Sequence, residues 1–111
     1  MNIEKILKIE VTHVPHNDEW GDPAHIRVTG YTEQGSFTLR KIEGLSTERI
    51  IKKIEVIRRV FKRLEGTEIK VMERTYDRGD YRAPIKHRIA VPSALPDWAR
   101  GKWQDIVRNN Q

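Results

Sequence analysis

The sequence feature that most constrains the fold is the stretch from residue 46 to 66, STERIIKKIEVIRRVFKRLEG. Its apolar residues recur at intervals of four and three, which is the spacing of one face of an α-helix. This apolar stripe consists of Ile50, Ile54, Ile57, Phe61 and Leu64. The opposite face is mostly cationic and carries Lys52, Glu55, Arg59, Lys62 and Arg63. The pattern therefore predicts a long amphipathic helix with one face for the core and one for solvent.

Both ends of this helix carry recognisable signals. Ser46 can accept a hydrogen bond from a free amide at the start, and Leu45 can pack onto Ile50. Gly66 can adopt the left-handed conformation that often follows a helix. The apolar stripe could also form the seam of a homodimer, but its length of about two or three heptads favours packing on the chain's own sheet.

Five segments around the helix have the alternating pattern of half-buried β-strands. They comprise residues 2–14, 25–31, 36–43, 67–75 and 85–91. The connection at residues 32–35 is short enough for a hairpin, and Gly35 can take a positive φ there. A short helix is expected near the C-terminus. We therefore predict one α+β domain over residues 1–111, with a small antiparallel or mixed sheet covered by one long amphipathic helix, in the order β-β-β-α-β-β-α.

The strand pattern also predicts which side chains face the core. In the first strand, the expected inward residues are Ile3, Leu7, Ile9 and Val11. In the last strand, His87 has the same parity as Ile85 and Ile89. His87 is therefore expected to be a hydrogen-bonded core histidine.

The net charge of +5 is unevenly distributed along the chain. Residues 1–30 hold three basic and five acidic side chains, a balance of −2, so the remaining residues carry +7. A basic surface formed by the later residues is typical of a protein with a polyanionic partner. Richness in Lys, Arg and Glu can also reflect surface ion pairs of a thermophilic protein.

Aromatic residues lie among the cations of the second polar loop, YDRGDYRAP, at residues 76–84. Cations neutralise phosphates and aromatic rings stack on unpaired bases, so this combination favours single-stranded DNA or RNA. The candidate nucleic-acid-binding residues are Lys52, Arg59, Lys62 and Arg63 on the helix, followed by Arg74, Tyr76, Arg78, Tyr81, Arg82, Lys86 and Arg88.

The first polar loop concentrates imidazoles and carboxylates. Its candidate metal ligands are His13, His16, Asp18, Asp22 and His25, with Glu19 among them. These residue types bind divalent cations where thiolates are absent. The spacing matches no known metal motif, however, and polar residues also collect in loops because they form turns. A solvated loop without metal is therefore the default interpretation.

Several classes of protein are disfavoured by the composition. The chain has no cysteine, which excludes disulfides, thiol catalysis and thiolate metal sites and fits a cytoplasmic protein. No apolar run is long enough to span a bilayer, so we expect no membrane partner. The seven glycines are scattered singly, so no phosphate-binding loop is formed and no cofactor is expected.

Three functional hypotheses follow from these patterns. The first is a non-enzymatic nucleic-acid-binding protein that uses its basic surface and aromatic stacking. The second is a small interaction or inhibitor protein of viral or mobile-element origin, with a protein partner. The third is a metal-dependent nuclease that uses the loop from His13 to His25.

Overall fold

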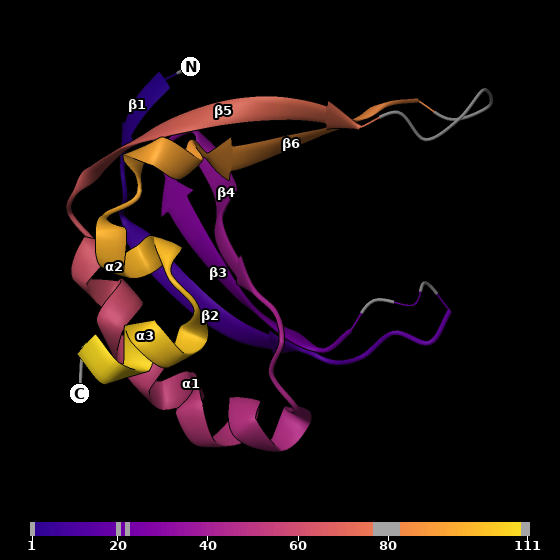
Figure 1. Ribbon diagram of the computed structural model, residues 1–111. Coiled ribbons are helices and arrows are strands. Elements are labelled where there is room, and N and C mark those ends of the chain that lie inside the picture. Colours follow the sequence, from indigo (N-terminus) through magenta and orange to yellow (C-terminus); the bar gives the residue numbers. More distant parts are fainter. Residues whose placement is uncertain (1, 20, 22, 77–82, 110–111) are drawn as a thin grey trace.

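The computed structural model describes residues 2–19, 21, 23–76 and 83–109 as an α+β arrangement, with one mixed sheet of six strands and helices packed beside it (Figure 1). The strands are β1 (Asn2–Lys5), β2 (Lys8–Val14), β3 (His25–Thr32), β4 (Gly35–Ile42), β5 (Glu68–Tyr76) and β6 (Ile85–Ala90). The helices are α1 (Thr47–Phe61), α2 (Asp97–Arg100) and α3 (Trp103–Asn109), with the short 3-10 turns η1 (Lys62–Leu64) and η2 (Pro92–Ala94).

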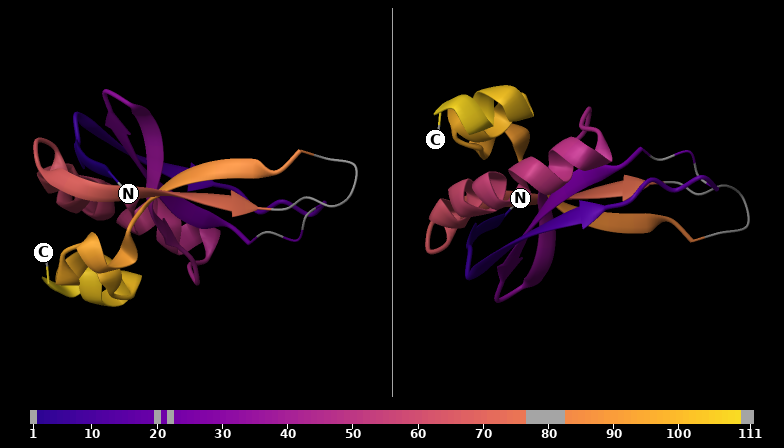
Figure 2. Two further views of the ribbon diagram at one scale, coloured as in Figure 1. Left: turned by 90° about the horizontal axis from the view of Figure 1, so that it is seen from above. Right: turned by 90° about the horizontal axis from the view of Figure 1, so that it is seen from below.

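The strand order in the sheet is β1-β5-β6-β4-β3-β2. All neighbours are antiparallel except β4 and β6, which run parallel and pair at Thr38 and Ile89. The sheet therefore has two antiparallel halves, β1-β5-β6 and β2-β3-β4. Figure 2 shows the β5–β6 ribbon lying across the strands of the other half.

The two outermost strands, β1 and β2, are consecutive in the chain and are separated only by Ile6 and Leu7. At this point the backbone changes the segment to which it is hydrogen-bonded. The Ile6 amide donates to the Thr67 carbonyl after α1, at 2.9 Å, and the Leu7 amide donates to the Tyr31 carbonyl in β3, at 2.7 Å. One bent strand therefore belongs to both halves and curls the sheet round towards closure.

This bend corrects the prediction of a single strand over residues 2–14 and explains why the sheet has more strands than expected. The predicted parity also fails there, because Ile3 and Leu7 are 62% and 54% exposed whereas Ile6 is fully buried. Beyond the bend, Ile9 and Val11 face the core as predicted.

The predicted helix forms as α1 and its end signals are confirmed. The Arg49 amide donates to the Ser46 side chain at 3.3 Å, and Gly66 has a φ of +87° after the 3-10 turn. The stripe is buried at Ile50, Ile57 and Phe61 within the chain's own core.

We expected one long helix to cover the sheet, but α1 covers only part of it. The helix packs mainly against β2, β3 and α3, so it covers one half of the sheet. Trp98 of α2 adds to the core by packing against the ring of Phe61, with 5.3 Å between ring centroids. Within the described part of the chain, no helix has the length and apolarity needed to cross a membrane.

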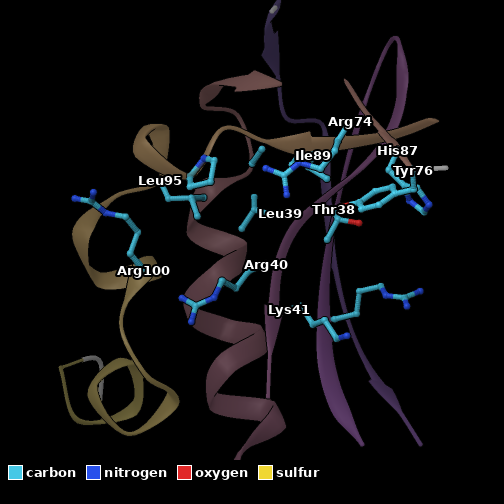
Figure 3. Close-up of a pocket in the computed structure, with 13 residues that line it drawn as sticks. Thr38, Leu39, Arg40, Lys41, Arg74, Tyr76, His87, Ile89, Leu95 and Arg100 are labelled. Carbon is cyan, nitrogen blue, oxygen red and sulfur yellow. The ribbon is translucent and has the colours of Figure 1, made fainter. Parts of the chain in front are cut away.

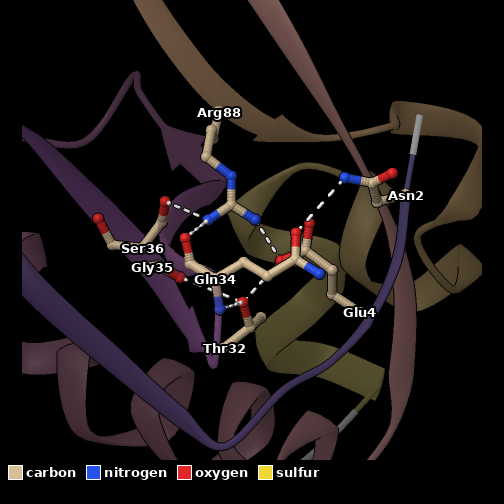
Figure 4. A network of polar contacts seen from close by, with 7 residues as sticks. All are labelled: Asn2, Glu4, Thr32, Gln34, Gly35, Ser36 and Arg88. Carbon is tan, nitrogen blue, oxygen red and sulfur yellow. Dashed lines mark hydrogen bonds and ion pairs between the residues drawn. The ribbon is translucent and has the colours of Figure 1, made fainter.

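A buried ion pair within the β1-β5-β6 half is hydrogen-bonded to the β3–β4 hairpin and so links the two halves of the sheet (Figure 4). The side chain of Glu4 in β1 is 2% exposed and bonds to the Arg88 guanidinium of β6. Its Oε1 atom also accepts a hydrogen bond from the Thr32 hydroxyl at 2.6 Å. Arg88 donates to the carbonyls of Gln34 and Ser36 at 3.0 and 3.4 Å, so one guanidinium connects β1, β6 and the β3–β4 turn.

Two opposing effects set the ionisation of Glu4. Burial of the carboxyl would raise its pKa, but the hydrogen bonds from Arg88 and Thr32 and the positive charge of Arg88 outweigh that effect. The pKa of Glu4 therefore lies below its ordinary value, and the carboxylate stays charged at neutral pH.

We expect Glu4→Gln to lower the free energy of unfolding by about 3 kcal/mol at neutral pH, because Arg88 loses its charged partner in a buried setting. Since folding lowers the pKa of Glu4, its stabilising contribution is present above the ordinary pKa and is lost as pH falls through the folded-state pKa. The difference between variant and natural protein should therefore shrink in urea titrations repeated towards acidic pH.

The matched control is Glu33→Gln, which removes an exposed carboxylate from the β3–β4 turn near the same network. We expect this control to change stability by less than about 0.5 kcal/mol. A loss in Glu4→Gln that stays constant as the pH falls would contradict the assigned role of the carboxylate.

Candidate functional site

A groove of about 1110 Å³ lies between the sheet and the segment that follows β6 (Figure 3). Its lining comes from β3, β4, β5, β6 and residues 92–100. Five cationic side chains surround it, namely Arg27, Arg40, Lys41, Arg74 and Arg100. Among the described residues that line it there is no carboxylate. The groove therefore concentrates positive charge from segments that are far apart in sequence.

The centre of the groove is apolar. Leu39, Ala90 and Leu95 are buried core residues that also line it, and the half-buried Ile89 lies beside them. Thr38, which pairs with Ile89 where β4 and β6 meet, adds a hydroxyl to this lining. An apolar floor with a cationic rim suits a ligand that has flat apolar parts and negative charges.

Two of the cations face each other directly across a pair of strands. Arg27 of β3 is in register with Lys41 of β4, so their side chains leave the same face of the sheet at neighbouring positions. Lys41 also pairs with Glu43 at 2.9 Å, but both side chains are roughly half exposed and such a surface pair contributes little. Within the described residues, the side chain of Arg27 has no hydrogen-bond or ion-pair partner. Two like charges in this arrangement repel each other and attract an anion.

An aromatic pair lies beside these cations. The rings of Tyr76 and His87 pack edge to face, with 5.1 Å between centroids and 86° between planes. Tyr76 is 44% exposed and is one of the most exposed large apolar side chains of the described chain. Arg74, in register with His87, is also exposed and lines the groove. His87 is exposed, so the expectation of a buried core histidine is wrong: the outer face of β6 borders the groove instead of a packed layer.

Arg40 lines the groove, but its guanidinium is already engaged. Nη2 donates to the Gly101 carbonyl at 2.8 Å, and Nη1 donates to the Ala99 carbonyl. Partial burial lowers the pKa of Arg40, although a guanidinium stays protonated at any physiological pH. Arg100, between those two carbonyls, pairs with the exposed Asp97 and borders the groove.

The structure separates the basic residues predicted from sequence. Arg74 and Tyr76 line the groove. The four residues predicted on the helix are exposed and are not part of the lining: Lys52 and Arg59 on α1, and Lys62 and Arg63 on η1. Arg88 is engaged with Glu4, and Lys86 is exposed on β6 outside the lining. The predicted residues Arg78, Tyr81 and Arg82 lie outside the described residues.

The first polar loop shows local turn contacts. His16 pairs with Asp18 at 2.8 Å, and the Glu19 amide donates to the Asn17 side chain at 3.0 Å. His25 is buried at the start of β3, where its Nδ1 atom lies 3.1 Å from the Pro23 carbonyl. His13 lies in β2, half-buried, and Asp22 lies outside the described residues. Among the described side chains, no group of three or more His, Asp or Glu is placed to hold a metal ion.

Comparison of the chain with protein-family models, with curated proteins and with solved structures gave no match in any of the three cases.

We expect Arg27→Gln to raise the free energy of unfolding by about 0.5 kcal/mol at low ionic strength, because it removes the repulsion from Lys41 across the strands. Added salt screens this repulsion, so the gain should disappear in urea titrations at high ionic strength. Lys86→Gln is the matched control, since it removes one positive charge from an exposed strand position outside the groove. An equal gain in the control would trace the effect to net charge and not to the facing pair.

Proposed function

We propose that this protein is a non-enzymatic nucleic-acid-binding protein that holds a single strand in the cationic groove. The observation that carries the proposal is the combination in one groove of five cations, an apolar floor and an exposed aromatic pair. Each of these features suits a different part of an unpaired nucleotide chain.

In such binding, cationic side chains contact the phosphates and aromatic rings contact the bases. Lys and Arg side chains that neutralise phosphates release condensed counterions, which gives affinity without sequence preference. Exposed rings such as Tyr76 stack on base faces, which are available in a single strand and hidden inside a duplex. The apolar floor around Leu39 and Leu95 can pack against the same unpaired bases. The groove therefore favours single-stranded over duplex nucleic acid.

The connectivity of the sheet supports this proposal by analogy. With β1 and β2 counted as one bent strand, the chain makes five strands in a curled sheet, with a helix between the third and the fourth. This arrangement resembles the OB-fold, a five-stranded, partly open fold whose second and third strands bind oligonucleotides or oligosaccharides. Here those strands are β3 and β4, which carry Arg27 and Lys41. The likeness concerns topology, and the residues of the groove carry the functional argument.

The experiment is fluorescence-anisotropy titration of the full chain against labelled single-stranded DNA, single-stranded RNA and duplex DNA of equal length. Each probe is titrated over a range of salt concentrations, with and without magnesium, and is then examined for cleavage. With four cations on phosphates, the plot of log affinity against log salt should have a slope of about −3 for a single strand. Absence of binding to all three probes at low salt would overturn the proposal, and shortening of a probe with magnesium would favour the nuclease hypothesis.

Separate variants decide which basic surface is used. The groove variant carries Arg27→Gln and Arg74→Gln, and the helix variant carries Arg59→Gln, Lys62→Gln and Arg63→Gln. We expect the groove variant to bind a single strand more weakly with a shallower salt slope, because two phosphate contacts are lost. The helix variant should keep most of the affinity. The reverse ranking would move the binding surface to α1.

We expect Tyr76→Ala to weaken binding by about 1–3 kcal/mol, the usual contribution of one base–aromatic stack. Because no charge changes, the salt slope should stay constant. Tyr76→Phe retains the ring and should bind as the natural protein does. If Tyr76→Phe weakened binding as much as Tyr76→Ala does, stacking on this ring would be the wrong account.

A further inference from the structure

The chain after β6 builds a second wall of the groove. The backbone leaves the sheet at Val91, whose amide donates to the Lys70 carbonyl at 2.9 Å, and then forms η2, α2 and α3. Three side chains of this segment border the groove: Pro92, Leu95 and Arg100. Figure 3 shows Leu95 and Arg100 on one side of the groove, with Lys41, Tyr76 and His87 on the other.

The back of this wall is held by core packing. Ala99 and Ile106 are fully buried, and Trp98 packs on Phe61 of α1. The guanidinium of Arg49 lies over the ring of Trp103, 5.7 Å from its centroid. These contacts attach α2 and α3 to the rest of the chain, but they lie away from the groove. A separate contact holds the side of this segment that borders the groove.

Arg40 supplies that contact. Its two nitrogens donate to the carbonyls of Ala99 and Gly101, the residues immediately before and after Arg100. These carbonyls lie at the end of α2, where a helix has no internal donors left for them. A planar guanidinium can hold two acceptors at once, which fixes the backbone on both sides of Arg100.

We propose that Arg40 is a positioning residue that sets Arg100 in the second wall, and that Arg100 contacts a phosphate of a strand bound in the groove. This inference rests on the proposed function. Arg40 is assigned the positioning role because one donor on each of its Nη atoms is bound to a carbonyl of this segment. Arg100 is ion-paired with Asp97, but Asp97 is 93% exposed and a surface pair of this kind is readily exchanged for a phosphate.

The test is a double-mutant cycle in binding to a labelled single-stranded DNA. The variants are Arg40→Lys, Arg100→Gln and the two combined. We expect Arg100→Gln to weaken binding about tenfold, as the loss of a hydrogen bond to a charged group does. Its salt slope should fall by about 0.7, the value for one phosphate contact on a single strand.

Arg40→Lys keeps the positive charge but cannot hold both carbonyls, so it should weaken binding by displacing Arg100. The double variant should then bind no more weakly than Arg100→Gln alone, because both changes remove the same contact. In a second cycle, Arg40→Lys combined with Arg74→Gln should show independent, multiplied losses. Lys102→Gln is the matched control for Arg100→Gln, since Lys102 lies two residues further on and does not line the groove.

Thermal melts of each variant show whether the chain stays folded at the assay temperature. If Arg40→Lys unfolds the segment, the comparison of Arg100→Gln with Lys102→Gln still tests the wall directly. The inference is overturned if the natural protein binds and Arg74→Gln weakens it while Arg100→Gln equals Lys102→Gln. It is also overturned if the Arg40 and Arg100 losses multiply. Absence of binding by the natural protein would instead overturn the proposed function.

Discussion

The backbone changes its hydrogen-bond partner between Ile6 and Leu7, and this change ties the two halves of the sheet together. Apart from the helices, the two halves of the sheet meet directly at the parallel contact between Thr38 and Ile89. The bent N-terminal strand supplies the second connection, because β1 pairs with β5 and β2 pairs with β3. The Glu4–Arg88 pair strengthens this connection, because it is hydrogen-bonded to the β3–β4 hairpin of the other half. A groove between the halves keeps its shape because both connections hold.

The same geometry explains why the candidate site draws on distant parts of the sequence. Crossing of the β5–β6 ribbon over the β3–β4 hairpin brings Arg74 and Tyr76 to the same groove as Arg27 and Lys41. Arg100, which also lines the groove, lies near the C-terminal end of the described chain. A single local motif therefore does not mark the groove, and the positive charge becomes concentrated only in the folded protein.

Sequence patterns predicted the parts of the fold that depend on local chemistry. The cap at Ser46 and the positive φ at Gly35 and Gly66 follow from side-chain type and are confirmed. The partner change at Ile6 could not be predicted, because both halves of the segment are individually good strands. The sequence also contains no signal that would place the helix cations and the second polar loop on one surface.

The groove residues escaped prediction for a related reason. In the hairpin, Thr29 pairs with Thr38 but Val28 pairs with Arg40, so Leu39 is an extra residue in β4. This bulge sets the register that places Arg27 opposite Lys41, and alternation alone does not reveal where it falls. Parity predicts that His87 faces the core, but β6 faces the groove on that side. Only Arg74 and Tyr76 were found from sequence, because charge and an aromatic ring occur together there.

The buried pair between Glu4 and Arg88 joins residues separated by 84 positions. During synthesis the β2–β3–β4 meander and α1 can therefore assemble while the N-terminal strand still lacks its partners in β5 and β6. Contacts of such long range slow folding, because a large loop must close before they form. The β1–β5 pairing and the Glu4–Arg88 contact therefore form only after β5 and β6 have been made. The lining of the groove extends to Arg100, so the groove also lacks one of its walls until residues 92–100 have been added.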